Sequence, residues 1–208
     1  MDIPATLAGK LKHNIYNSMA AIGACFALGT SFDVIREALS EFGSDVNSNP
    51  GRFNIYDLGG FKVVLDYGHN IEGYRVTIDG LKALKPSRLI GVIGVPGDRL
   101  DTDIYNVGKI SGNSFDYIYI KEDSDLRERQ PLEVAKILYR GALSSGISKD
   151  SVKIVPDEVD ALRQALQKAG KGDVIVVFFE KMQALVDVIK EYQEEIYIEE
   201  QQVQQMPV

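Results

Sequence analysis

Apolar positions at helical spacing dominate the first part of the chain. Residues 14–42 predict two helices, an almost wholly apolar one over about 18–28 and a second, one-sided one over about 34–42. A helix that is apolar all round has to be covered on every side, and only about a dozen residues precede this one. The pattern therefore predicts that further structure belongs upstream of it.

After residue 51 the pattern changes to short apolar runs that alternate with amphipathic helices. The runs FNIYDL and FKVVLDY, separated by Gly59-Gly60, predict a β-hairpin, because paired glycines adopt the positive φ that two-residue turns require. Further strands are predicted at 88–94, 116–121, 152–155 and 174–179, and helices at 71–84, 102–111, 131–143, 157–169 and 182–192. This alternation predicts an α/β fold with a doubly wound, mostly parallel sheet and an antiparallel hairpin at its N-terminal side.

The segment GSDVNSNPG marks the boundary between these two patterns, since it combines glycine, proline and small polar residues. We assign residues 1–43 to the helical unit, 44–51 to a linker and 52–192 to the α/β domain. The tail, residues 193–208, mixes acidic and glutamine residues with few apolar anchors, and we expect it to be disordered or a frayed helix extension.

Charge and cysteine content narrow the classes of function. With 23 basic against 30 acidic residues in 208, the formal net charge is -7, which argues against binding to nucleic acid or to anionic membranes. The one cysteine, Cys25, has no partner for an internal disulfide, and no Cys/His cluster suits a metal ion. The chain carries no export signal and no apolar stretch of about eighteen residues, so we expect a cytoplasmic protein without a membrane span.

Candidate chemistry lies in the loops that follow the predicted strands, because ligands of doubly wound sheets bind beyond the carboxyl ends of the strands. Asp66 ends an apolar strand, where its carboxylate has to cap the next helix or accept hydrogen bonds from a ligand hydroxyl. His69, one of two histidines, is either structural or catalytic. In the loop 94–99, Arg99 suits a phosphate or a carboxylate, or else pairs with neighbouring aspartates.

Residues 121–129 carry three positive and four negative charges. Such a mixture fits a zwitterionic ligand, in which Arg127 or Arg129 pairs with a carboxylate while Glu122, Asp123 or Asp125 meets an ammonium or guanidinium group. The alternative is a solvated loop of internal salt bridges. The sequence contains no GxxxxGK[ST] phosphate loop, so it has no self-sufficient nucleoside triphosphate site.

An ordered series of motifs extends from about Ile3 to about Tyr192: KLKHNIYNSMAAIGA, NPGRFN, VVLDYGHNIEGY, IGVIGVPGDRLD, YIKEDSDLRER and VVFFEKMQ. This series resembles the Mur ligase superfamily and, within it, the carboxy-terminal part of the cyanophycin synthetases. These ligases use ATP to phosphorylate a carboxylate, and an amine then attacks the acyl phosphate to form an amide bond.

The resemblance implies that residues 1–43 are the last helices of a central ATPase domain and that 52–192 form a Rossmann-like carboxy-terminal domain. The linker 44–51 would then be a hinge, and the phosphate loop and the ligands of magnesium would lie upstream. We therefore expect the isolated chain to bind ATP weakly or not at all and to have no ligase activity. The resemblance also suggests a homo-oligomer.

The resemblance implies roles for individual residues. Asn14 and Asn17, next to His13, correspond to adenine-side asparagines, Arg52 to an arginine near the ribose and phosphates, and Asp66 to a carboxylate on the ribose hydroxyls. His69 and Asn70 would line the interdomain cleft as catalytic residues, and no residue is implied as a metal ligand. The residues that would hold the incoming amino acid are Asp98, Arg99, Lys121, Asp125, Arg127 and Arg129.

In cyanophycin synthetases that amino acid is arginine, which is joined to an aspartate side-chain carboxylate of an acidic acceptor chain. Gly68 and Ile71 depart from the usual DYAHNP motif, and Glu128 replaces the glycine expected between the two arginines, which puts the amino-acid preference in question. The alternatives are the corresponding domain of another Mur-type ligase, acting on a peptidoglycan precursor or polyglutamate, and a non-catalytic amino-acid-binding module.

Overall fold

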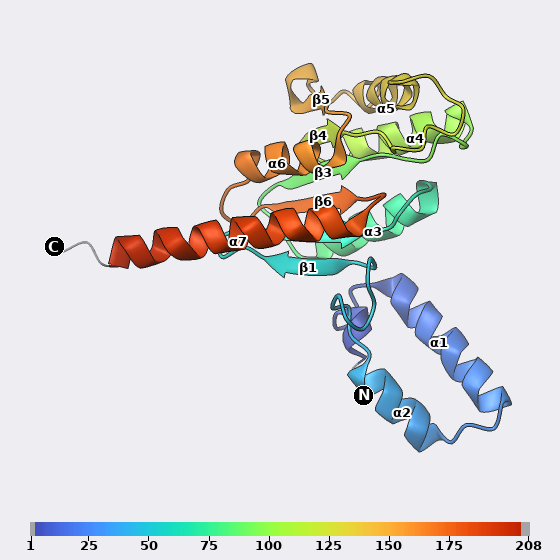
Figure 1. The fold of residues 1–208 in the computed structure, drawn as a ribbon. Coiled ribbons are helices and arrows are strands. Elements are labelled where there is room, and N and C mark those ends of the chain that lie inside the picture. The colour runs from blue at the N-terminus through green and yellow to red at the C-terminus, as the bar shows by residue number, and fades with distance from the viewer. Residues whose placement is uncertain (1–2, 205–208) are drawn as a thin grey trace.

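Short runs rich in valine and isoleucine form the sheet in the computed structural model, which describes residues 3–204 (Figure 1). Its strands are β1 (Asn54–Asp57), β2 (Lys62–Asp66), β3 (Leu89–Ile93), β4 (Tyr117–Ile120), β5 (Val152–Ile154) and β6 (Val174–Phe178). Their spatial order is β1-β2-β6-β3-β4-β5, in which β1 is antiparallel to β2 and the other neighbours pair in parallel. The last strand of the chain, β6, therefore lies between β2 and β3.

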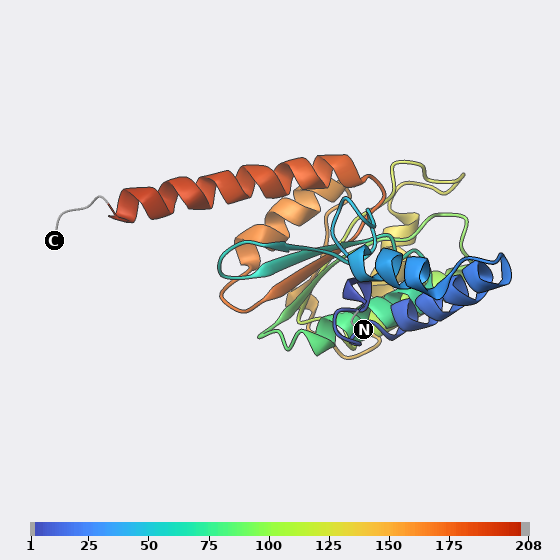
Figure 2. The same ribbon diagram turned by 90° about the horizontal axis from the view of Figure 1, so that it is seen from below.

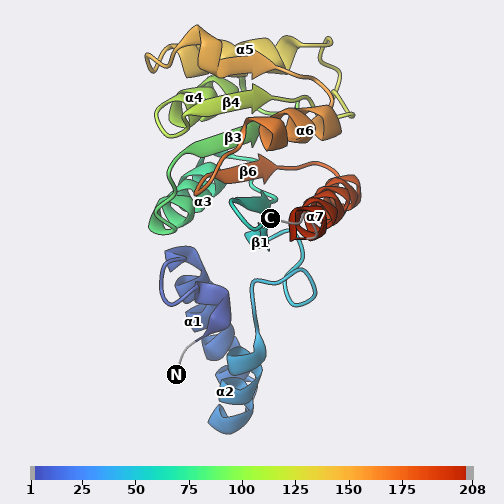
Figure 3. The same cartoon turned by 90° about the vertical axis from the view of Figure 1, so that its left-hand side faces the viewer.

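Helices cover both faces of this sheet (Figure 3). One face carries α3 (Ile71–Ala83), α4 (Asp101–Gly112) and α5 (Glu133–Leu143), and the other carries α6 (Glu158–Lys168) and α7 (Met182–Gln204). Successive strand residues alternate between the two cores, as Val63 and Val64 show: the first packs under α6 and α7, the second under α3. The expected doubly wound α/β fold with an antiparallel hairpin is confirmed.

The helical unit lies beside this domain, as Figure 1 shows. A short 3₁₀ turn, Pro4–Thr6, precedes α1 (Lys12–Ala27) and α2 (Phe32–Glu41), and a second one, Lys149–Ser151, precedes β5. Met19, Phe26 and Leu28 are 62%, 57% and 86% exposed, so the apolar surface that the sequence predicts to need a cover is open to solvent here.

The linker is a folded turn rather than an open connection. The side chain of Asn54, which is 1% exposed, accepts a hydrogen bond from Gly51 N and donates to the carbonyls of Ser44 and Asn49. Asp45 accepts two further bonds, from the amides at positions 47 and 48. These contacts tie the linker to β1.

Of the two alternatives for the C-terminal segment, disorder or a helix extension, the described residues follow the second. The structure continues α7 through 193–204, so that the helix projects past the domain (Figure 2). Tyr192 and Ile196 pack against the core under α6 and α7, and these two anchors extend the helix beyond the predicted end. Residues 205–208 lie outside the described part. None of the described helices combines the length and apolar character needed to cross a membrane.

Candidate functional site

The site begins at the end of β2, where Asp66 is 8% exposed. Its Oδ1 accepts hydrogen bonds from Gly68 N (2.8 Å) and Thr77 Oγ1 (3.1 Å), and its Oδ2 accepts from Phe53 N (3.0 Å). Burial raises the pKa of this carboxyl group, although these donors oppose the effect. Asp66 does not cap the next helix. That role belongs to Asn70, whose Oδ1 accepts from Gly73 N (2.8 Å).

The residues after Asp66 form a small aromatic and cationic cluster. The ring of Tyr67 lies 5.3 Å from that of His69 and 5.6 Å from that of Phe179, and the Arg52 guanidinium lies 5.5 Å from the Tyr67 ring centroid. His69 Nδ1 lies 3.1 Å from the Tyr67 carbonyl oxygen. The cluster joins the end of the linker to the loop after β2.

A cavity of about 990 Å³ separates this cluster from the helical unit. Its polar walls bring together all of the residues that are expected to bind the nucleotide or to line the interdomain cleft. These residues are Asn14, Asn17, Arg52, Asp66, His69 and Asn70. His13 also lines it, and burial lowers the pKa of its imidazole. Apolar residues of α1 and α2, among them Ile22 and Leu39, line its far end.

A second, smaller cavity of about 290 Å³ lies behind His69 and Asn70, which line both spaces. Arg99 and Asp103 contribute charges to its wall, and Val95 contributes an apolar surface. Within the described residues, the buried Nε of Arg99 makes no hydrogen bond, and it lies 3.9 Å from Asp98 Oδ1. The loop after β3 thus supplies an arginine to the site.

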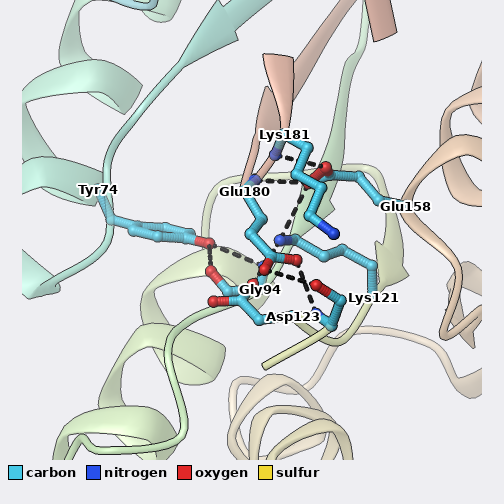
Figure 4. A network of polar contacts seen from close by, with 8 residues as sticks. Tyr74, Gly94, Lys121, Asp123, Glu158, Glu180 and Lys181 are labelled. Carbon is cyan, nitrogen blue, oxygen red and sulfur yellow. Dashed lines mark hydrogen bonds and ion pairs between the residues drawn. The ribbon is translucent and has the colours of Figure 1, made fainter. Parts of the chain in front are cut away.

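Two of the cationic side chains expected to bind the incoming amino acid are instead paired with other groups of the protein. Lys121 is 1% exposed, and its Nζ lies 2.6 Å from Asp123 Oδ1 and 3.1 Å from Glu158 Oε1 (Figure 4). Arg129 donates to the carbonyls of Gly97 and Arg99 and to the carboxylates of Asp101 and Glu133. Both side chains hold neighbouring loops together, and neither lines the two cavities described above.

Arg127 differs from these two, since its side chain is 53% exposed and, among the described residues, pairs only with the exposed Asp125, at 2.8 Å. The backbone of Arg127 and Glu128 is left-handed, with φ of 49° and 68°. A glycine adopts this conformation without strain, which is the physical reason for the glycine expected at position 128.

Sequence reasoning missed the buried polar groups that connect these loops. Tyr74 on α3 is fully buried, and its hydroxyl donates to Gly94 O (2.9 Å) and accepts from Gly94 N (3.1 Å). The Glu180 carboxylate after β6 accepts from Ser124 N and Oγ. The strand-end rule points to Glu180, whereas Tyr74 occupies an apolar helix face and carries no such signal. Among the side chains that the structure describes, no group of three or more His, Cys, Asp or Glu is arranged for a metal ion.

Comparison with known proteins agrees with this arrangement. The family model described as Mur ligase, glutamate ligase domain, matches residues 51–178, which include the sheet from β1 to β6. The chain belongs to the Mur ligase family. The expected resemblance to that superfamily is confirmed, and so is the assignment of the α/β fold to its C-terminal domains.

This Mur ligase domain is similar in sequence to two kinds of ligase. It is 37% identical over 191 residues to cyanophycin synthetase of Geminocystis herdmanii, an alignment that covers 92% of this chain and 22% of that protein. It is 35% identical to UDP-N-acetylmuramoyl-L-alanyl-D-glutamate--2,6-diaminopimelate ligase of Clostridium botulinum, over 91% of this chain and 38% of that protein. The chain therefore spans about a fifth of the cyanophycin synthetases it matches.

Solved structures show the same fold. UDP-N-acetylmuramate-alanine ligase MurC of Thermotoga maritima superimposes with a TM-score of 0.64 at 18% identity, over 88% of this chain and 38% of that one. MurF ligase of the same organism, solved in complex with ADP, gives a TM-score of 0.58 at 18% identity, over 85% of this chain and 37% of that one. Both matches extend into the helical unit, because each covers a larger share of the chain than the linker and everything after it could supply.

Proposed function

We propose that this Mur ligase domain closes the nucleotide site of an ATP-dependent amide ligase of the cyanophycin synthetase type. The observation that carries the proposal is the single cavity of about 990 Å³ with nucleotide-compatible groups on opposite walls. Asn14 and Asn17 offer amides for a base, Asp66 offers carboxylate lone pairs for ribose hydroxyls, and Arg52 offers a fixed positive charge for phosphates. These donors and acceptors fit ATP.

ATP would supply the phosphoryl group that converts the acceptor carboxylate into an acyl phosphate. The amine of the incoming amino acid then forms the amide bond, and phosphate leaves. When His69 Nδ1 donates to Tyr67 O, Nε2 is an acceptor that can take a proton from this amine. Asn70 Oδ1 is engaged in capping α3, so its amide N–H groups are the part directed to ligands.

For the incoming amino acid we propose arginine, added to an aspartate side-chain carboxylate of an acidic acceptor chain. Arg127 and Arg99 are the cations whose head groups are most open to an α-carboxylate, since Lys121 and Arg129 are already paired within the protein. Diaminopimelate is the competing substrate, because one relative is named as a diaminopimelate ligase and because diaminopimelate, like arginine, is zwitterionic.

We further propose that the isolated chain is inactive. The sequence lacks a phosphate loop, so ATP and magnesium would be held mainly by a segment upstream of this chain. The exposed apolar surface of α1 and α2 supports such a neighbour, because it would leave water on contact. Closure of the two parts would then exclude water from the acyl phosphate.

Isothermal titration of the chain with arginine, lysine, aspartate and diaminopimelate, with and without ATP and magnesium, tests this assignment. We expect arginine-selective binding that Arg127→Ala abolishes and that Arg163→Ala preserves. Arg163 is a matched control, because it is equally exposed and pairs with Glu191 on the other face of the sheet. Preference for diaminopimelate contradicts the arginine assignment, and ATP-dependent amide formation by the isolated chain contradicts its inactivity.

A further inference from the structure

The loop after β6, residues 179–181, contacts both parts of the proposed site. We call the linker end with the cluster around Tyr67 the nucleotide half, and residues 121–129 the amino-acid half. Adjacent residues of one short loop face the two halves: Phe179 meets the nucleotide half, and Glu180 meets the amino-acid half.

On the amino-acid side, Glu180 holds the beginning of the charged loop through both of its oxygens. Oε2 accepts from Ser124 N at 2.6 Å, and Oε1 accepts from Ser124 Oγ at 2.8 Å. Burial raises the pKa of this carboxyl group, but the donors from Ser124 and the nearby Lys121 cation outweigh burial, and its pKa lies below the usual value. Glu180 is therefore a charged acceptor at neutral pH.

A second carboxylate fixes the backbone of the same loop, as Figure 4 shows. Glu158, at the start of α6, accepts from Glu180 N (2.6 Å) and Lys181 N (3.1 Å), and it also pairs with the buried Lys121. Lys121, Glu158, Glu180 and Ser124 are thus joined in that order by consecutive polar contacts. These contacts leave Glu180 little freedom to move without Ser124.

On the nucleotide side, Phe179 is held between β2 and the linker. Its N–H donates to Asp66 O at 3.3 Å, and its ring packs against Tyr67. Gly51, with φ of +75°, leaves room for that ring, because a Cβ there would lie 2.8 Å from Phe179 Cζ. Tyr67 N in turn donates to Gly51 O at 2.9 Å, next to Arg52.

We propose that Glu180 is a positioning residue through which the loop 179–181 couples the two halves of the site. A displacement of the charged loop moves Glu180, and the adjacent Phe179 carries that displacement to Tyr67 and Arg52. The names of the two halves rest on the proposed function. The coupling itself is a property of the ligand-free chain, so it is tested without ATP or an amino acid.

Amide hydrogen exchange of the free chain, followed by NMR, tests the coupling. The reporters are the amides of Arg127 and Arg129 for one half and of Tyr67 and Gly68 for the other, each hydrogen-bonded within its own half of the site. Because Glu180→Ala removes two charge-assisted bonds, we expect exchange about tenfold faster at both sets of amides. Glu191→Ala, which removes an exposed carboxylate elsewhere on the domain, should change neither set.

Glu180→Gln separates positioning from a role of charge. Its amide oxygen can accept from Ser124 N while its NH2 donates to Ser124 Oγ, so exchange should stay close to that of the unmodified chain. Ser124→Ala removes one exposed hydroxyl and should keep the fold. Exchange at both sets of amides should be faster than in the unmodified chain, but less so than in Glu180→Ala.

Two results overturn the proposal. Faster exchange at Arg127 and Arg129 with unchanged exchange at Tyr67 and Gly68, in Ser124→Ala or Glu180→Ala, means that the halves are independent. Exchange in Glu180→Gln as fast as in Glu180→Ala means that Glu180 acts through its charge rather than by holding Ser124. Either result leaves the proposed ligase function untouched.

Discussion

At the scale of single residues, His13, on the wall of the nucleotide cavity, should make the stability of the chain depend on pH. Burial lowers the pKa of its imidazole, so around pH 6.5 the unfolded chain binds more protons than the folded chain. The free energy of unfolding should therefore be undiminished by His13 above the pKa that this side chain has in the unfolded chain. It should fall as the pH drops from about 6.5 toward the lowered pKa of the folded chain. Urea denaturation at a series of pH values measures this slope, and His13→Gln should flatten it. An unchanged slope in that variant contradicts the assignment.

Glu128 illustrates local strain at the same scale. Its φ of 68° is unfavourable for a residue with a Cβ, so Glu128→Gly should stabilise the chain by about 0.5–1 kcal/mol, the difference between left-handed strain and the backbone entropy of glycine. Thermal unfolding checks this. Gln130→Gly, in the same loop without a positive φ, should be neutral or destabilising, and equal effects of the two substitutions would count against the strain argument.

Among the elements, the packing of α4 on α5 depends on glycine. A Cβ at Gly108 would overlap the carbonyl oxygen of Leu138, and one at Gly141 would overlap that of Tyr105. Gly108→Ala should therefore destabilise the domain by about 3 kcal/mol, because backbone has to move. Gly23→Ala in α1, where the added Cβ meets open space, should stabilise by about 0.5–1 kcal/mol. Chemical denaturation of both variants measures this contrast in sign.

The elements also show what the sequence can predict. Alternating short apolar runs and amphipathic helices predict the α/β class, because side-chain periodicity is a local property. The place of β6 between β2 and β3 is set by packing between distant segments and leaves no local pattern. The sequence left open whether residues 193–204 are helical or disordered, because only two anchors, Tyr192 and Ile196, attach the end of α7 to the core.

The same distinction holds for the candidate site. Asp66 ends β2, and His69 and Asn70 lie in the loop after it, so the strand-end rule places all three on the cavity that the structure shows. Lys121 sits in a run of charges typical of a solvated loop, yet it is buried, because its partner Glu158 comes from a distant helix. Pairing across long sequence separations is not readable from one sequence.

At the scale of the whole molecule, the helical unit and the α/β domain each supply one wall of the large cavity. The apolar surface of α1 and α2 is exposed, and the sequence has no phosphate loop. In the proposed function, the chain is therefore the closing part of a larger catalytic unit. Its activity should appear only when a phosphate-binding part faces this cavity.

A chimera tests this claim most directly. The chain would replace the corresponding 22% of the Geminocystis herdmanii cyanophycin synthetase, and phosphate release would be measured with an acidic acceptor chain and single amino acids. We expect phosphate release that requires ATP, magnesium and arginine. Asp66→Ala should abolish it, whereas Asp187→Ala, an exposed change on α7, should not. A folded chimera that releases no phosphate with any amino acid, or that prefers diaminopimelate to arginine, would contradict this claim.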